Sequence, residues 1–200
     1  MSSQNQSLLF NALPRVPLIR ASDAVSYGVH PALLSYYAKT GRLERIAPGV
    51  YRNHDVDMLV DFQWEDLVLS VQGIPRGVVC LTSALAIYDL TEEIPREHWI
   101  AVPHATTAPR RTNCKIVRMR NMTLGLTEIV MGETAIQIFD VERTLVDAFR
   151  YLSKETAIKA LKAAFSFSRA EKPNLVKLER YACALRVRVR MADFILMVTT

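Results

Sequence analysis

The sequence predicts an α+β protein in which an N-terminal winged helix-turn-helix precedes a mixed α/β C-terminal domain. Ala24 precedes Gly28 by four residues, as in two helices that meet at a tight turn. A hairpin pattern with Pro48 and Gly49 at its turn follows the second helix. Further along, helical periodicity alternates with short apolar runs typical of strands. We therefore expect one domain at residues 1–57 and a second at residues 58–200.

Composition limits the classes of protein to consider. Half of the 200 residues are hydrophobic and only seven are glycine, so the chain can form a substantial core. The net charge of +5 mildly favours a polyanionic partner. Three separated cysteines fit neither a disulfide framework nor a zinc cluster. Without a secretory signal or an apolar run of about 18 residues, we expect a soluble, cytoplasmic protein with no membrane contact.

Within the first domain, helices are expected at residues 6–13, 23–27 and 31–40. Ser22 is a favourable N-cap for the second of these, and Gly28 is suited to a left-handed turn. Pro31 suits the first turn of the third helix, which ends at Gly41. Strands at 43–46 and 50–53 would form the wing.

The second domain is expected to alternate helices with strands. Helices are predicted at 62–72, after Thr82 or Ser83 as a cap, after Asp140 as a cap, and at 154–167 and 175–185. Strands are predicted at 77–81, 99–102, 115–119, 126–131 and 134–138, the last two joined at Gly132-Glu133. The tail RVRVRMADFILMV could be a helix or a strand, because its arginines alternate before the run becomes apolar.

The third helix would enter the DNA major groove, as the second helix of a helix-turn-helix does. Leu34 and Tyr37 should face the core, which leaves an outward face for base and phosphate contacts: His30, Ala32, Ser35, Tyr36, Lys39 and Thr40. Tyr36 could instead belong to the core. Basic residues near the sugar-phosphate backbone would be Lys39, Arg42, Arg45 and Arg52. The alternative is a winged helix used for protein docking, with its charges solvated.

A second basic patch lies outside the wing, at Arg110, Arg111, Lys115, Arg118 and Arg120. It could extend the DNA footprint, bind an acidic protein surface, or be a solvated loop and strand edge. Arg186, Arg188 and Arg190 would lie on one face if the tail were a strand.

Catalysis has little support in the sequence, and we expect neither a metal site nor a cofactor. Asp55 and Asp57 have the Asp-x-Asp spacing of a nucleotidyltransferase, but no Gly-Ser turn precedes them. Asp140, Arg143 and Asp147 form a charged set at helical spacing. We expect them to have a structural role, as an N-cap and as ion pairs that fix one helix.

Three segments resemble the AbiEi family: GRLERIAPGVYR at 41–52, CLTSALAIYDLTEEIP at 80–95 and FDVERTLVDAFR at 139–150. AbiEi proteins are antitoxins and transcriptional repressors of type IV toxin–antitoxin systems. The resemblance implies a winged-helix domain that binds inverted repeats in double-stranded promoter DNA. It also implies a C-terminal domain needed for antitoxicity, and a nucleotidyltransferase-like toxin as a functional partner.

The leading hypothesis is therefore a sequence-specific DNA-binding repressor that regulates its own operon and acts as the antitoxin of a type IV pair. One alternative is an orphan winged-helix regulator whose C-terminal domain senses a ligand. A nucleotidyltransferase is the third, and the missing motif argues against it.

Overall fold

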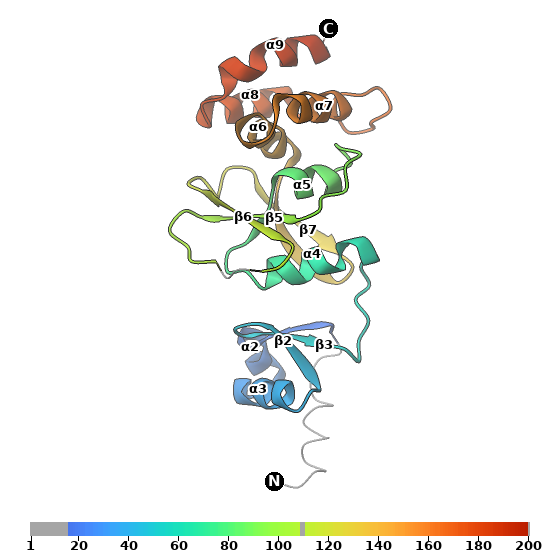
Figure 1. The fold of residues 1–200 in the computed structure, drawn as a ribbon, viewed down its shortest axis with the longest axis vertical. Coiled ribbons are helices and arrows are strands. Elements are labelled where there is room, and N and C mark those ends of the chain that lie inside the picture. The colour runs from blue at the N-terminus through green and yellow to red at the C-terminus, as the bar shows by residue number, and fades with distance from the viewer. Residues whose placement is uncertain (1–15, 109–110, 200) are drawn as a thin grey trace. The chain divides into compact units, whose positions relative to one another are not determined.

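The structure is a computed structural model that describes residues 16–108 and 111–199 (Figure 1). The chain divides into two compact units. Unit 1 extends to Ile74 and includes Val130–Ala135, and unit 2 comprises Pro75–Ile129 and Ile136–Thr200. The helix expected at 6–13 lies outside the described residues. The predicted α+β class, with a winged helix-turn-helix before a mixed α/β region, is confirmed.

The helix-turn-helix of unit 1 consists of α2 (Ala21–Ala24), the 3₁₀ turn Val25–Tyr27 and α3 (Pro31–Lys39). Gly28 has φ 71° and ψ 16°, the left-handed conformation that the sequence predicted for the turn. Ala24 is fully buried, since α3 packs closely against α2. The predicted cap at Ser22 is wrong: α2 begins two residues earlier than expected, with Arg20 as its N-cap, and the Ser22 hydroxyl donates to the Asp23 carboxylate instead.

The wing is a three-stranded sheet in the order β1-β3-β2. Its strands are β1 (Leu18–Arg20), β2 (Leu43–Ala47) and β3 (Val50–Asn53), and β3 pairs antiparallel with both neighbours. Gly49 takes φ 74° in the hairpin turn. Tyr51 on β3 joins Leu34 and Tyr37 of α3 in the small core of this unit. The wing thus fixes one side of α3 and leaves the other side to solvent.

A further helix of unit 1, α4 (Phe62–Gln72), has the bounds that the sequence predicted. Asp61 is its N-cap, and the Asp61 side chain accepts a hydrogen bond from the backbone N–H of Gln63. Its buried residues include Leu67, Val68 and Val71, at the spacing of one helical face.

A five-stranded sheet runs in the order β6-β5-β4-β8-β7. Its strands are β4 (Val78–Val79), β5 (His98–Pro103), β6 (Cys114–Met119), β7 (Leu126–Met131) and β8 (Thr134–Phe139). β4 pairs antiparallel with β5 and parallel with β8, whereas β5 and β6 are parallel. The cap expected at Thr82 or Ser83 is wrong: α5 (Leu81–Ile87) begins after Cys80, and the Ser83 hydroxyl accepts from the backbone N–H of Trp99.

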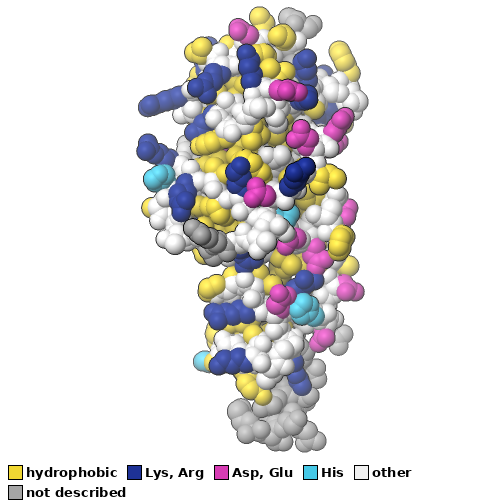
Figure 2. Space-filling view, viewed as in Figure 1, with side chains coloured by type: hydrophobic (Ala, Val, Ile, Leu, Met, Phe, Trp, Pro, Cys, Tyr) yellow, Lys and Arg dark blue, Asp and Glu magenta, His cyan; other side chains and the backbone are white. Residues whose placement is uncertain are grey.

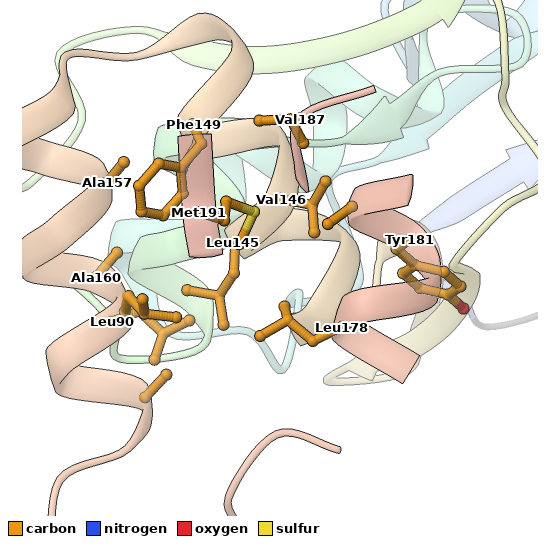
Figure 3. Packing of buried hydrophobic residues seen from close by; sticks show 14 of the residues in the cluster. Leu90, Leu145, Val146, Phe149, Ala157, Ala160, Leu178, Tyr181, Val187 and Met191 are labelled. Carbon is orange, nitrogen blue, oxygen red and sulfur yellow. The ribbon is translucent and has the colours of Figure 1, made fainter. Parts of the chain in front are cut away.

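The main core of unit 2 lies among four C-terminal helices (Figure 3). They are α6 (Val141–Tyr151), α7 (Lys154–Ala164), α8 (Leu175–Ala184) and α9 (Arg188–Thr199). Alanines at 157, 160 and 164 let α7 approach α6 closely. The ambiguous tail is helical, because Met191, Phe194 and Ile195 share one helical face that packs on this core. A strand carrying Arg186, Arg188 and Arg190 is therefore excluded.

Candidate nucleic-acid interface

The outer face of α3 is the candidate interface of unit 1. Leu34 and Tyr37 are buried, as predicted, and the six positions expected to face outward are all exposed: His30, Ala32, Ser35, Tyr36, Lys39 and Thr40. Tyr36 is 40% exposed and its ring meets that of Tyr37 edge-on, so it lies on the surface rather than in the core. The face is therefore sterically available, and its contacts with DNA remain a prediction.

His30 has a structural task at the start of α3. It is the N-cap residue, and its Nδ1 accepts a hydrogen bond from the backbone N–H of Ala32 at 3.2 Å. Capping satisfies one of the otherwise unpaired N–H groups of the first turn. Only Nε2 then remains to bond a base edge or a phosphate.

Ser35 and Tyr51 connect α3 to the wing. The Ser35 hydroxyl lies 3.0 Å from the Tyr51 hydroxyl, and either can donate. Tyr51 is 3% exposed, so this bond ties the middle of α3 to a fixed point on β3. Ser35 is thereby both an exposed candidate contact and a positioning residue for the helix.

A pair of substitutions separates these two roles of Ser35. Ser35→Ala removes the exposed hydroxyl and the bond to Tyr51, whereas Tyr51→Phe removes only the bond. We expect Ser35→Ala to reduce discrimination between specific and unrelated DNA by about 1 kcal/mol, and Tyr51→Phe to leave it unchanged, measured as the ratio of the two dissociation constants. Equal loss in both variants would assign Ser35 a positioning role only.

The basic residues at the end of α3 and in the wing are not equivalent. Lys39, Arg42 and Arg45 are exposed, but Arg52 is half-buried and forms an ion pair with Glu65 of α4. The Nε of Arg52 is buried with no hydrogen-bond partner among the described residues. Because its guanidinium already holds β3 to α4, we expect Arg52 to make no phosphate contact.

The second basic patch belongs to unit 2. Lys115, Arg118 and Arg120 are exposed on β6 and just after it, Arg111 is half-buried, and Arg110 lies outside the described residues. The Lys115 ammonium lies 4.0 Å from the centroid of the Trp99 ring, a cation–π contact that fixes its position.

The charged set at α6 consists of Asp140, Arg143 and Asp147, and all three side chains form contacts within the fold. Arg143 is fully buried, with its Nε 2.7 Å from Asp147 Oδ2 and its Nη groups donating to the carbonyl oxygens of Leu124 and Asn121. Asp147 also accepts from Arg150 at 2.5 Å. Asp140 caps the helix by accepting from the backbone N–H of Arg143 at 2.8 Å. These contacts give the charged set a structural role, which the sequence favoured over a role in acid–base catalysis.

Gly125 allows the loop before β7 to lie directly on α6. Its carbonyl oxygen accepts from the backbone N–H of Asp140 at 2.8 Å. A Cβ at this position would lie 2.6 Å from the Cβ of Arg143. Glycine is therefore required here, both for this approach and for its φ of 70°.

A lysine on α8 links that helix to the start of α6. The Lys177 ammonium lies 3.0 Å from carboxylate oxygens of Asp140 and Glu142. Burial alone would raise the pKa of Glu142, but hydrogen bonds from the Asn174 backbone N–H and from Lys177 outweigh it and lower the pKa. Burial likewise opposes the charge on Lys177, yet the two carboxylates raise its pKa.

These shifts predict how unit 2 responds to acid. A carboxyl with a lowered folded-state pKa stabilises the fold above its unfolded pKa, and this contribution is lost as the pH falls through the folded value. The stability difference between the parent and Glu142→Gln should be largest near neutral pH and should shrink below about pH 4.5, the ordinary value for the group. Urea unfolding at several pH values measures it. A difference that stays constant down to pH 3 would contradict the assignment.

Asp55 and Asp57 are both exposed, and the Asp55 backbone N–H donates to the side-chain oxygen of Asn53. In the described part of the chain, no three histidine, cysteine or acidic side chains come together as metal ligands. Within residues 16–108 and 111–199, no helix combines the length and apolar character needed to cross a membrane.

The turn at Gly28, the exposed face of α3 and the three-stranded wing define a winged helix-turn-helix protein. Residues 6–54 match the model of a family described as transcriptional regulator, AbiEi antitoxin, which confirms the AbiEi resemblance over this segment. No curated protein matches the chain.

Proposed function

We propose that the chain is a sequence-specific repressor that binds inverted repeats in its own promoter and acts as the antitoxin of a type IV toxin–antitoxin pair. Residues 1–57 would bind the DNA, and residues 58–200 would supply the antitoxin function. The observation that carries the DNA-binding part is the exposed polar face of α3, held by a cap at its start and by Tyr51 from the wing. The family match over residues 6–54 supports the same function.

A gel-shift experiment tests the DNA-binding part. The full chain is mixed with labelled DNA from immediately upstream of its own gene, with unlabelled unrelated duplex in excess, at two salt concentrations. We expect a retarded complex that survives the competitor and weakens steeply at the higher salt, because phosphate contacts release counterions. Equal retardation of upstream and unrelated DNA would contradict sequence-specific repression.

Co-expression tests the antitoxin part. The partner that we propose is a nucleotidyltransferase-like toxin encoded beside this gene. The full chain should restore growth to cells that produce the toxin, and residues 1–57 alone should not. If residues 1–57 restored growth as well as the full chain, the division of roles would be wrong.

A ligand-sensing regulator without a toxin partner is the alternative, and absence of a neighbouring toxin gene would favour it. We propose no catalytic role for this chain. Incubation with labelled nucleoside triphosphates tests that statement, and transfer of label dependent on Asp55 and Asp57 would overturn it.

A further inference from the structure

A pocket of about 500 Å³ in unit 2 is lined by five arginines and a histidine: Arg118, Arg120, Arg143, Arg150, Arg186 and His104. Among the described residues, no carboxylate lines it. Lys and Arg side chains also gather at the margin of the molecule where β6 lies (Figures 1 and 2). The pocket is therefore a concave, strongly positive feature that the proposed DNA interface does not use.

Three segments far apart in the sequence bring these arginines together. Arg118 and Arg120 come from β6 and the residues after it, Arg143 and Arg150 from α6, and Arg186 from the turn between α8 and α9. Asp147 neutralises part of the charge, since it accepts from both arginines of α6. Within residues 16–108 and 111–199, the other three arginines form no ion pair, so most of the positive charge is uncompensated.

Arg186 occupies a position that ordinarily favours glycine. The backbone N–H of Arg186 donates to Cys183, and that of Val187 donates to Ala182, so α8 ends in a Schellman motif. The left-handed residue of this motif is usually glycine, yet here it is Arg186 with φ 59°. The chain thus places a guanidinium at the pocket despite an unfavourable backbone conformation.

The remaining lining includes the uncharged side chains of Met119, Tyr151 and Leu185. A bare inorganic anion would gain little from these side chains, whereas the base or sugar of a phosphorylated molecule could pack against them. The volume lies in the range of small-molecule sites, and convergent arginines are the side chains that best match phosphate oxygens. We propose that this pocket binds a small phosphorylated ligand of the mononucleotide class.

The test uses the full chain, with ATP and inorganic phosphate as probes in isothermal titration calorimetry. ATP should bind saturably and more tightly than phosphate. Arg186→Gly removes the guanidinium and also relieves the backbone at that position, so the melting temperature of the free protein should not fall. The affinity for ATP should fall about tenfold or more, as expected for the loss of one charge-assisted hydrogen bond.

Two further variants complete the experiment. Arg118→Gln changes a lining residue from a different element, β6, and should weaken ATP binding in the same way. Arg190→Ala removes an exposed arginine of α9 that does not line the pocket, and it should leave the affinity unchanged. This readout contains no DNA, so its failure is separate from failure of the proposed repressor function.

Four results would overturn the proposal: full ATP affinity in Arg186→Gly, equal weakening by Arg190→Ala, phosphate binding as tight as ATP binding, or no ATP binding by the parent. If, in the last case, Arg186→Gly and Arg118→Gln weakened the binding of duplex DNA, the arginines would belong to a nucleic-acid surface instead.

Discussion

Replacing Lys39 and Arg45 together by alanine should weaken binding to the upstream DNA about tenfold or more at low salt. Both side chains are exposed, one at the end of α3 and one on β2 of the wing. Each phosphate contact contributes about 0.9 to the slope of log affinity against log salt. The slope should therefore fall by about two in the double variant, as measured by fluorescence anisotropy over a series of salt concentrations.

The matched control for this prediction is Lys172→Ala with Arg180→Ala, which removes the same charge from exposed positions in unit 2. It should change neither the affinity nor the slope. If both double variants lowered the slope equally, net charge rather than the wing would govern binding.

Arg52→Ala should be measured beside these variants. Its expected effect is lower stability of unit 1, because Arg52 pairs with Glu65.

Replacing Arg143 by methionine should lower the free energy of unfolding of unit 2 by about 3–5 kcal/mol. The substitution leaves the buried Asp147 with Arg150 alone and removes the donor from two carbonyl oxygens. Trp99 lies in unit 2 and Trp64 in unit 1, so Trp99 fluorescence in a Trp64→Phe background reports urea unfolding of unit 2 alone.

Two comparisons separate charge from packing in the Arg143 prediction. Arg150→Met removes the partner whose side chain is 26% exposed, and it should cost only about 1–2 kcal/mol. Arg143→Met combined with Asp147→Leu replaces the buried pair by apolar side chains, and it should recover part of the loss. If the double variant lost as much stability as Arg143→Met and Asp147→Leu lose separately when added together, an unpaired buried charge would not be the cause.

Local sequence signals predicted most elements of the fold. Helical spacing of Leu67, Val68 and Val71 identified α4 with its observed bounds, and Gly28 identified the turn before α3. Capping was less predictable, because a serine hydroxyl can bond to groups other than a helix N-terminus. Ser22 bonds to its neighbouring carboxylate, and Ser83 accepts from Trp99, 16 residues away.

Features that depend on distant segments could not be predicted. The alternation of Arg186, Arg188 and Arg190 has the period of a strand, but burial of Met191 and Phe194 against α6 and α7 makes the segment helical. The pairing of Arg52 with Glu65 depends on where α4 packs. The parallel pairing of β4 with β8 joins segments about 60 residues apart, beyond the reach of local periodicity.

The arginine pocket could not be predicted from the sequence either, because its residues come from distant segments. Arg118 and Arg120 stood out only as part of a linear patch, and nothing local connects them with Arg150 or Arg186. A left-handed backbone at Arg186 is also unexpected, since glycine or asparagine ordinarily signals it.

Dimethyl sulfate footprinting of the protein on its upstream DNA tests the central claim most directly. The reagent methylates N7 of guanine in the major groove and N3 of adenine in the minor groove, so it reports which groove the protein occupies. With α3 in the major groove, guanines within each inverted repeat should be protected in the parent, and protection should fall in the Lys39→Ala, Arg45→Ala variant at the same protein concentration. Unprotected guanines in a fully bound complex would contradict the claim that α3 reads the DNA.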